Sequence, residues 1–381
     1  MKLSKLQLVE YRKPFKVGFH SPQIHRRTAE SILVKMTFAD GGCGYGECAP
    51  RPYVTGETCQ SVIAAIGHHA APLLFANTVE TLDHLAQLLG EIETQCRDAT
   101  RHACLSALTA IELGLLDALG RRTRKPIGDI IGRPPSRQPH RSISIPFLPT
   151  DSIQALFERL KPVISIDAVK ILMKSDLQEN IRRVAFIRTM VGAEMPLRIE
   201  ANGKWSFDEA LAHIEALAPY GVVAVEEPLQ AAQPRHLHQL REKTGIDIIL
   251  DESVCSLEDA RKMTAAQACD GFNLKLSKCG GLLRLMALAD FAQRNHLKCQ
   301  LGTHVGEGPV LDAAGWYAAA SHDIFYHYEG YSSLLFLDLN HDPQGWRMLA
   351  APPSFEGHGL GIDTRGLAPL FDSPGSIDIT P

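Results

Sequence analysis

The chain has no Cys-x-x-Cys pair, no long apolar run and no strong excess of charge. Its nine cysteines form an odd set, so neither a disulfide framework nor a thiolate zinc site is indicated. No apolar run approaches the roughly 18 residues of a membrane span, and the start, Met-Lys-Leu-Ser-Lys-Leu-Gln, contains no apolar signal core. The net charge of −4 and the pI near 6.5 argue against a nucleic-acid or membrane-surface partner. We therefore expect a soluble, cytoplasmic protein.

The chain is long enough for one large or two medium domains. It has 381 residues, of which 45% are hydrophobic, and can bury a large core. A segment rich in proline and glycine, residues 132–139, interrupts the strand and helix patterns that precede it. We predict three parts: an α+β capping domain over residues 1–132, a barrel with the metal site over residues 140–340, and a C-terminal segment, residues 341–381, that packs back on the cap.

From residue 142 onward, short apolar runs alternate with amphipathic helical segments. The runs that predict strands are Ser142–Phe147, Ala168–Met173, Leu197–Ala201, Val222–Glu226, Asp247–Asp251, Gly271–Leu276, Leu297–Gly302 and Phe325–Glu329. Two helix starts are spelled as capping boxes, Ser206 with Glu209 and Ser256 with Asp259. This alternation predicts a closed α/β barrel of the (β/α)7-8, TIM-like type.

Three carboxylates follow apolar strands at nearly equal spacing. Glu200, Glu226 and Asp251 are 226 − 200 = 26 and 251 − 226 = 25 residues apart, and Lys275 follows after 275 − 251 = 24 residues. This step matches one strand and one helix with short loops, and the strand ends of a parallel barrel meet on one rim. Three oxygen ligands at one point suit a hard divalent cation such as Mg²⁺. The spacing therefore predicts a metal site.

The motifs around these residues resemble those of the enolase superfamily, in its muconate lactonizing enzyme and mandelate racemase branch. They are Val169-Lys170-Ile-Leu172, Glu200-Ala-Asn202-Gly-Lys-Trp205-Ser, Val-Glu226-Glu227-Pro228, Leu-Asp251-Glu252-Ser and Leu-Lys275-Leu-Ser-Lys278-Cys-Gly280-Gly281. The resemblance covers nearly the whole chain. It implies that the three carboxylates hold Mg²⁺, or Mn²⁺ as a substitute, and that the metal binds a substrate carboxylate. It also implies that a base removes the proton α to that carboxylate, giving an enediolate that the metal stabilises.

Lys275 matches the acid/base lysine on the sixth barrel strand of that family. Relatives in the muconate lactonizing branch usually carry Lys-x-Lys at the end of the second strand, but this chain reads Lys170-Ile-Leu172-Met-Lys174. The distance to the first ligand, 200 − 172 = 28 residues, makes Leu172 the counterpart of the second lysine. Either that base is lost, or Lys170 or Lys174 replaces it, because residues two apart share a strand face. We interpret Lys278 as supporting structure.

Four further residues match positions near the site. His304 lies at the end of the seventh strand, where mandelate racemase relatives carry a catalytic histidine. It has either a catalytic or a structural role. The usual aspartate partner of that histidine is replaced by a lysine. Glu329 matches an eighth-strand acid that hydrogen-bonds the substrate carboxylate, with a solvated strand end as the alternative. Asn202 and Glu252 lie beside ligands and are expected to orient them.

Two cap segments, residues 16–27 and 49–58, match the mobile loops that close over the barrel in this family and contact the far end of the substrate. The candidate specificity residues in them are His20, Arg26, Arg51 and Tyr53. A solvated surface is the alternative for these side chains. If they face the substrate, they imply an anionic or hydrogen-bonding distal group.

These features together predict a Mg²⁺-dependent racemase or epimerase of an amino-acid derivative or related small carboxylate. The alternative enzyme is a cycloisomerase or dehydratase with one acid/base group, which Leu172 favours. If Lys170, Lys174 or His304 provides a second acid/base group, the racemase or epimerase is favoured instead. A binding protein on a retired barrel is a third reading, against which the intact carboxylates argue. The expected partners are a small-molecule carboxylate and, in a homo-oligomer, further copies of the chain, without nucleic acid or membrane.

Overall fold

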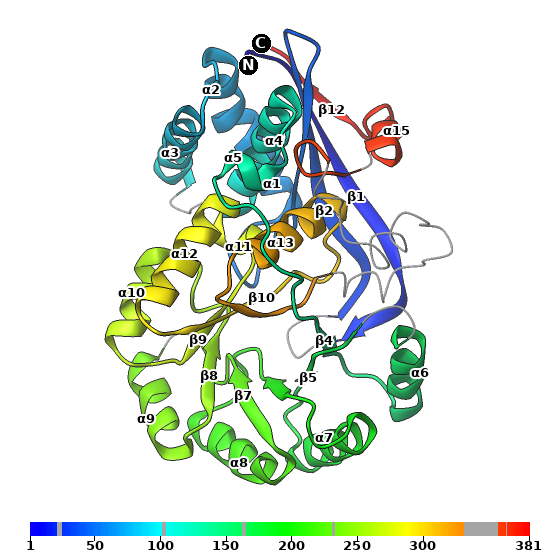
Figure 1. The fold of residues 1–381 in the computed structure, drawn as a ribbon, viewed down its shortest axis with the longest axis vertical. Helices are drawn as coiled ribbons and strands as arrows, with labels where there is room; N and C mark the ends of the chain where they lie inside the picture. Colours follow the sequence, from blue (N-terminus) through cyan, green and yellow to red (C-terminus); the bar gives the residue numbers. More distant parts are fainter. Residues whose placement is uncertain (21–24, 101–103, 162–164, 231–232, 331–356, 363) are drawn as a thin grey trace.

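The computed structural model describes residues 1–20, 25–100, 104–161, 165–230, 233–330, 357–362 and 364–381. A barrel and a smaller cap lie one above the other along the longest axis of the molecule, and both ends of the chain lie at the tip of the cap (Figure 1).

Eight parallel strands form the barrel, in sequence order from the first to the last. Each predicted run contains one of them: β4 Ser142–Ile145, β5 Ala168–Leu172, β6 Leu197–Glu200, β7 Val222–Glu226, β8 Asp247–Leu250, β9 Gly271–Leu274, β10 Lys298–Leu301 and β11 Phe325–Tyr328. The Tyr328 amide donates to the His140 carbonyl at 2.8 Å and closes the seam between β11 and the start of β4. The TIM-like barrel is therefore confirmed.

Helices connect the barrel strands and cover their outer face. They are α6 Thr150–Leu160, α7 Leu177–Val191, α8 Phe207–Leu217 with η2 Ala218–Tyr220, α9 Pro234–Thr244, α10 Leu257–Ala265, α11 Leu276–Cys279, α12 Leu282–Arg294 and α13 Pro309–Ser321. Both predicted capping boxes are present, and in the first the Ser206 amide donates to Glu209 at 2.8 Å. These caps satisfy amides that a helix start leaves without partners.

The cap is a four-stranded antiparallel sheet with helices packed on it. Its strands are β1 Leu3–His20, β2 His25–Phe38, β3 Cys43–Cys48 and β12 Ile377–Ile379, in the order β12-β1-β2-β3. Its helices are α1 Cys59–Ala65, η1 Ile66–Ala70, α2 Ala71–Ala76, α3 Leu82–Thr100, α4 Leu105–Thr123 and α5 Ile127–Ile130, with η4 Thr364–Gly366 and α15 Ala368–Phe371 near the C-terminus. Leu6 of β1 pairs with Ile379 of β12, so the last residues complete the sheet. The boundaries near residues 132–140 and 341 stay predictions.

Helix α4 lies directly against β3. A Cβ atom on Gly46 would lie 1.9 Å from the carbonyl oxygen of Ala110, so only glycine allows this approach. Helix α4 is thereby buried along most of its length between the cap sheet and the barrel helix α11.

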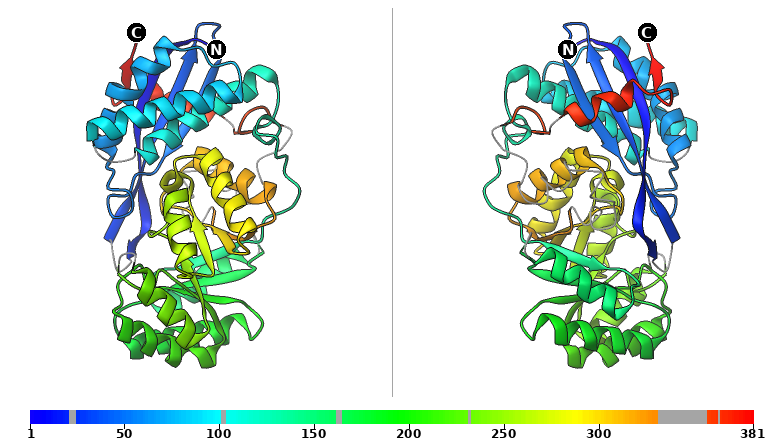
Figure 2. Two further views of the ribbon diagram at one scale, coloured as in Figure 1. Left: turned by 90° about the vertical axis from the view of Figure 1, so that its left-hand side faces the viewer. Right: turned by 90° about the vertical axis from the view of Figure 1, so that its right-hand side faces the viewer.

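In the segment 16–27, which we matched to a mobile loop, the residues up to His20 and from His25 form the paired ends of β1 and β2. The two strands form a long ribbon that extends from the cap beside the barrel (Figure 2). The local sequence lacks clean alternation, and the strands are specified by cross-strand hydrogen bonds that depend on the partner strand.

Buried carboxylates of the cap hold barrel helices at their first turns. Glu47 accepts hydrogen bonds from the amides of Gly308, at 2.7 Å, and Val310, at 3.1 Å, at the start of α13. Glu112 accepts from the amides of Leu282 and Leu283 at the start of α12. Acceptors at these amides also complement the helix dipole, so the two parts are joined by specific polar contacts.

One helical stretch among the described residues, Cys59–Ala76, is apolar and long enough for a membrane span by composition alone, with mean hydropathy 1.2. The stretch contains Gln60, Ser61, His68 and His69, so it is not an uninterrupted apolar run. A π-helical turn, η1, divides the stretch, and Val62, Ile66 and Leu74 are buried in the hydrophobic core. Core helices of globular domains meet the same criterion, so this stretch is weak evidence for a membrane.

Candidate metal centre and active site

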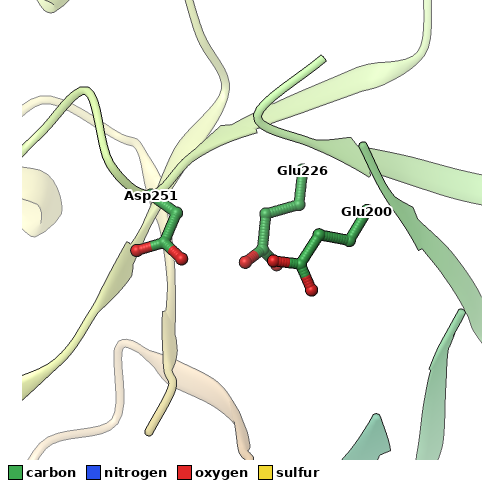
Figure 3. Close-up of side chains that lie close together, drawn as sticks. All are labelled: Glu200, Glu226 and Asp251. Atoms are coloured by element: carbon green, nitrogen blue, oxygen red, sulfur yellow. The ribbon is translucent and has the colours of Figure 1, made fainter. Parts of the chain in front are cut away.

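Three carboxylates meet at the ends of neighbouring barrel strands. Glu200 is the last residue of β6, Glu226 is the last residue of β7, and Asp251 directly follows β8. Their side chains point toward one another (Figure 3), and one oxygen of each lies within 4.8 Å of the others. All three are buried. The sequence spacing predicted that these three carboxylates lie close together, and the structure shows that they do.

This donor set fits a hard divalent cation. It consists of carboxylate oxygens alone, and oxygens on opposite sides of one Mg²⁺ are about 4.2 Å apart. The observed separations therefore need only small side-chain rotations to share an ion. Like charges this close in a buried site oppose one another, so a cation among them would stabilise the arrangement.

Lys170 lies inside the barrel against the first two carboxylates. Its ammonium is 3.0 Å from Glu200, 3.0 Å from Glu226 and 2.9 Å from Glu329. Burial opposes its charged form, but these carboxylates outweigh burial and raise the pKa of Lys170 above its usual value. Burial is also the main cause that raises the pKa of Glu226, to about 7. Lys170 therefore neutralises the carboxylates and is held by them.

The third carboxylate is held by two lysines. Lys275, which follows β9, donates to one oxygen of Asp251, and the Lys278 ammonium lies 2.9 Å from the other. Burial opposes the ionisation of Asp251, but both ammonium groups outweigh it and hold its pKa below the usual value. Burial likewise opposes the charge of Lys275, while Asp251 and Glu252 raise its pKa well above the usual value. Lys275 thus lies directly beside the candidate metal site.

Leu172 ends β5 with its side chain in the barrel. It shares the strand face of Lys170, whose ammonium is inside, and it pairs in register with Glu200. It is only 3% exposed. Lys174 lies beyond the strand, where it is paired with Glu179 and its ammonium is 5.3 Å from the Phe147 ring centre.

His304 lies in the loop after β10 and contacts the cap. Its Nδ1 is 2.9 Å from the carbonyl oxygen of Ala49, and since a carbonyl only accepts, Nδ1 carries the proton and Nε2 is the acceptor. Burial first, then the charges of Lys275 and Arg51, lower the pKa of His304 well below its usual value. The ring is therefore a neutral group.

Asn202 and Glu227 form hydrogen bonds to residues of the carboxylate cluster. The amide group of Asn202, whose φ is +49°, donates to Glu200 at 2.5 Å. Glu227, to which the sequence analysis gave no role, accepts from the Asp251 amide at 2.7 Å. Burial, with the charge of Asp251, raises the pKa of Glu252 to about 8.

Three polar side chains without an assigned role lie around the buried carboxylates. Asn273 donates to Glu226 at 2.6 Å, and Gln300 donates to its other oxygen. Arg198 is 3.0 Å from Glu329, which is buried between this guanidinium and an ammonium group rather than solvated. Each lies between two apolar residues of its barrel strand, and a period-two pattern in those strands would have identified it.

The candidate specificity residues have different surroundings. Arg51 is buried and donates to the carbonyls of Pro50 and Val305, both at 2.7 Å, so its guanidinium joins the cap to the loop after β10. Tyr53 is 40% exposed. The side chains of His20 and Arg26 lie outside the described part of the structure.

Comparison with known families agrees with this geometry. Residues 153–366 match the model of the enolase C-terminal domain-like family. Residues 5–132 match the model of the N-terminal domain of mandelate racemase and muconate lactonizing enzymes. The chain belongs to the enolase superfamily. Within it, the N-terminal match indicates the mandelate racemase and muconate lactonizing enzyme branch.

Similar members of the superfamily are isomerases. The chain is 25% identical to an N-succinyl-L-Arg/Lys racemase of Bacillus cereus, with 95% of each chain covered. It is 27% identical to muconate cycloisomerase 1 of Rhodococcus opacus, with 87% of this chain and 88% of the other covered. A dipeptide epimerase of Enterococcus faecalis, solved with Mg and the dipeptide L-Leu-L-Tyr, shares the fold with a TM-score of 0.81 at 22% identity, over 95% of this chain and 100% of the other.

Proposed function

We propose that this protein is a Mg²⁺-dependent isomerase that removes the proton α to the carboxylate of a small substrate. The observation that carries the proposal is the meeting of Glu200, Glu226 and Asp251 within 4.8 Å, with Lys275 in contact with the third. A bound Mg²⁺ supplies positive charge that stabilises the negative charge developing on the substrate carboxylate, and it offsets the carboxylates that raise the pKa of Lys275.

The proposal gives each side chain a separate task. Lys275 takes the α proton, because its ammonium contacts Asp251 and because it directly follows strand β9 at the rim of the barrel where the three carboxylates lie. Lys170, Lys278 and Asn202 orient the carboxylates through the contacts described above, as outer groups around metal sites do. Mn²⁺ is a substitute that the same oxygen donors accept.

The names of the relatives support an amino-acid derivative, such as an N-acyl amino acid or a dipeptide, as the substrate class. Abstraction of the α proton can lead to two outcomes. Racemisation or epimerisation is the first outcome and is favoured by the racemase and epimerase relatives. Cycloisomerisation or dehydration with one acid/base group is the second, and the aliphatic Leu172 favours it. We also propose that the protein forms a homo-oligomer and is located in the cytoplasm.

Hydrogen exchange tests the proposal without knowledge of the product. The purified protein is incubated in D₂O with Mg²⁺ and panels of N-acyl amino acids, dipeptides, muconate and hydroxy acids, and deuterium at the α carbon is measured by mass spectrometry. We expect incorporation for members of at least one panel and its loss in EDTA. Incorporation that survives EDTA and Lys275→Ala, or no incorporation with any panel, would overturn the proposal.

A further inference from the structure

We propose that the buried imidazole of His304 recognises the substrate by accepting a hydrogen bond from a neutral N–H or O–H group next to the α carbon. This inference rests on the proposed function and deepens it, because it names a chemical group that a substrate of this site must carry. The amide N–H of an N-acyl amino acid or a dipeptide is one source of such a donor. The hydroxyl of a 2-hydroxy acid is another.

Three hydrogen bonds fix the loop that carries the ring. Nδ1 of His304 donates to the carbonyl of Ala49 at 2.9 Å, and its backbone amide donates to the buried Glu307 at 2.8 Å. The carbonyl of the next residue, Val305, accepts from Arg51 at 2.7 Å. The ring is only 3% exposed. A group held in this way loses little conformational freedom when a ligand binds.

The second ring nitrogen is available to a ligand. Nε2 of His304 is buried and has no hydrogen-bond partner among the described residues. Because Nδ1 carries the proton, Nε2 has a lone pair and can only accept. The two nitrogens lie on different sides of the imidazole, so Nε2 faces away from Ala49. A buried acceptor without a partner is unfavourable, and a ligand that donates to it removes this cost.

His304 lies on the same part of the barrel rim as the proposed base. Strands β9 and β10 are parallel neighbours, and Lys275 and His304 follow their ends. One cap residue connects the two loops. The amide of Ala49 donates to the hydroxyl of Ser277 at 2.9 Å, while its carbonyl accepts from His304. A donor that reaches Nε2 is therefore expected close to the α carbon from which Lys275 takes the proton.

The charges around the ring favour a neutral donor. After burial, the charges of Lys275 and Arg51 lower the pKa of His304 well below its usual value, whereas Asp251 acts in the opposite direction. The Asp251 carboxylate is itself paired with two ammonium groups. An ammonium group of a ligand at Nε2 would be repelled by the two cationic side chains, but an amide N–H or a hydroxyl would not.

Paired ligands with and without the donor test the inference. The wild-type protein with Mg²⁺ is titrated by calorimetry with N-acetyl and N-succinyl amino acids and with counterparts in which an ester oxygen replaces the N–H. A second arm pairs 2-hydroxy acids with their methyl ethers. We expect the donor ligand of one arm to bind at least about tenfold more tightly than its counterpart, since the counterpart leaves Nε2 without a partner. Equal affinities within both arms, or no binding in either arm, would overturn the inference.

Exchange of the α proton in D₂O, measured on the same ligands, separates this inference from the proposed function. Undiminished exchange of the ester or ether counterparts overturns recognition by His304 and leaves the proposed function intact. A donor preference without exchange of any ligand overturns the proposed function instead.

The variant His304→Asn removes Nε2, while its side-chain amide can still donate to the carbonyl of Ala49. We expect the preference for the donor ligand to fall to less than about twofold. The matched control is His213→Asn on α8, because His213 is also buried, its Nδ1 lies 2.8 Å from the carbonyl oxygen of Glu209, and its Nε2 has no partner among the described residues. The control should keep the wild-type preference. An unchanged preference in His304→Asn would overturn the inference.

A crystal structure of the wild-type protein with Mg²⁺ and the tightest donor ligand decides the question if His304→Asn does not fold. We expect the donor atom of the ligand at about 3 Å from Nε2 of His304. A water molecule or another residue of the chain in that place would overturn the inference.

Discussion

The ammonium of Lys170 on β5 lies 2.9 Å from Oε2 of Glu329, while the other oxygen of that carboxylate lies 3.0 Å from the guanidinium of Arg198. These contacts connect the second and third barrel strands with the residue after the last one. All three side chains are buried. Such a network is stable only while its charges are paired, because unpaired buried charges are costly.

Lys170→Met should therefore destabilise the metal-free protein by about 3–5 kcal/mol, the cost of leaving buried charges without a partner. The measurement is urea unfolding in EDTA. Lys174→Met, the same change four residues later at a partly exposed ion pair, is the control and should cost at most about 1 kcal/mol. Equal losses in the two variants would contradict the buried network.

Asp251→Asn and Glu226→Gln should weaken Mg²⁺ binding at least tenfold, since each removes a charged ligand from a set of three. Isothermal titration calorimetry measures the change. Glu215→Gln, at an exposed position of α8, is the control and should bind as the wild type does. Unchanged Mg²⁺ affinity in both site variants would disprove the assignment of these carboxylates as ligands.

Lys275→Ala should reduce α-proton exchange by about 10²-fold or more, the contribution expected of general acid/base catalysis. Circular dichroism and Mg²⁺ titration should stay close to wild type, because Lys278 still holds Asp251. Lys262→Ala on the exposed face of α10 is the control. A Lys275→Ala protein with more than about a tenth of the wild-type rate would rule out this lysine as the base.

Glu112 should make stability depend on pH. Burial, partly opposed by the amides of Leu283 and Leu282 and by Arg284, raises its pKa from 4.5 to about 7. The folded protein therefore binds this proton more tightly than the unfolded chain does. The stabilisation is fully present below pH 4.5 and is lost as the pH rises through about 7.

The variant Glu112→Gln isolates this effect, because its side-chain oxygen still accepts from the two amides but carries no charge. Between pH 5 and 8 the wild type should lose stability relative to the variant, by at most about 3 kcal/mol at roughly 1.4 kcal/mol per pKa unit. Urea unfolding at several pH values measures this, with the exposed Glu91→Gln as control. A constant difference between the two proteins over this range would show that Glu112 does not titrate there.

Much of the fold and of the metal site could be predicted from residue order alone. The steps from Glu200 to Glu226 to Asp251 each span one strand and one helix, and parallel strands in a closed barrel bring such ends to one rim. The capping boxes at Ser206 and Ser256 are local, since both partners lie three residues apart. Features of this kind need only short-range geometry and a repeated unit.

The tertiary structure decided the partners of the charged side chains. Lys170 could have been a base by sequence, yet its contacts come from carboxylates 30, 56 and 159 residues away. Arg51 could have faced a substrate, yet it donates to Val305 across the cap–barrel boundary. The sequence by itself placed the ends of the barrel strands to within one or two residues, because strand periodicity is local. The pairing of the charged side chains was decided only by closure of the barrel. A buried ionised group is costly without an oppositely charged partner, and closure brings together partners that are distant in sequence.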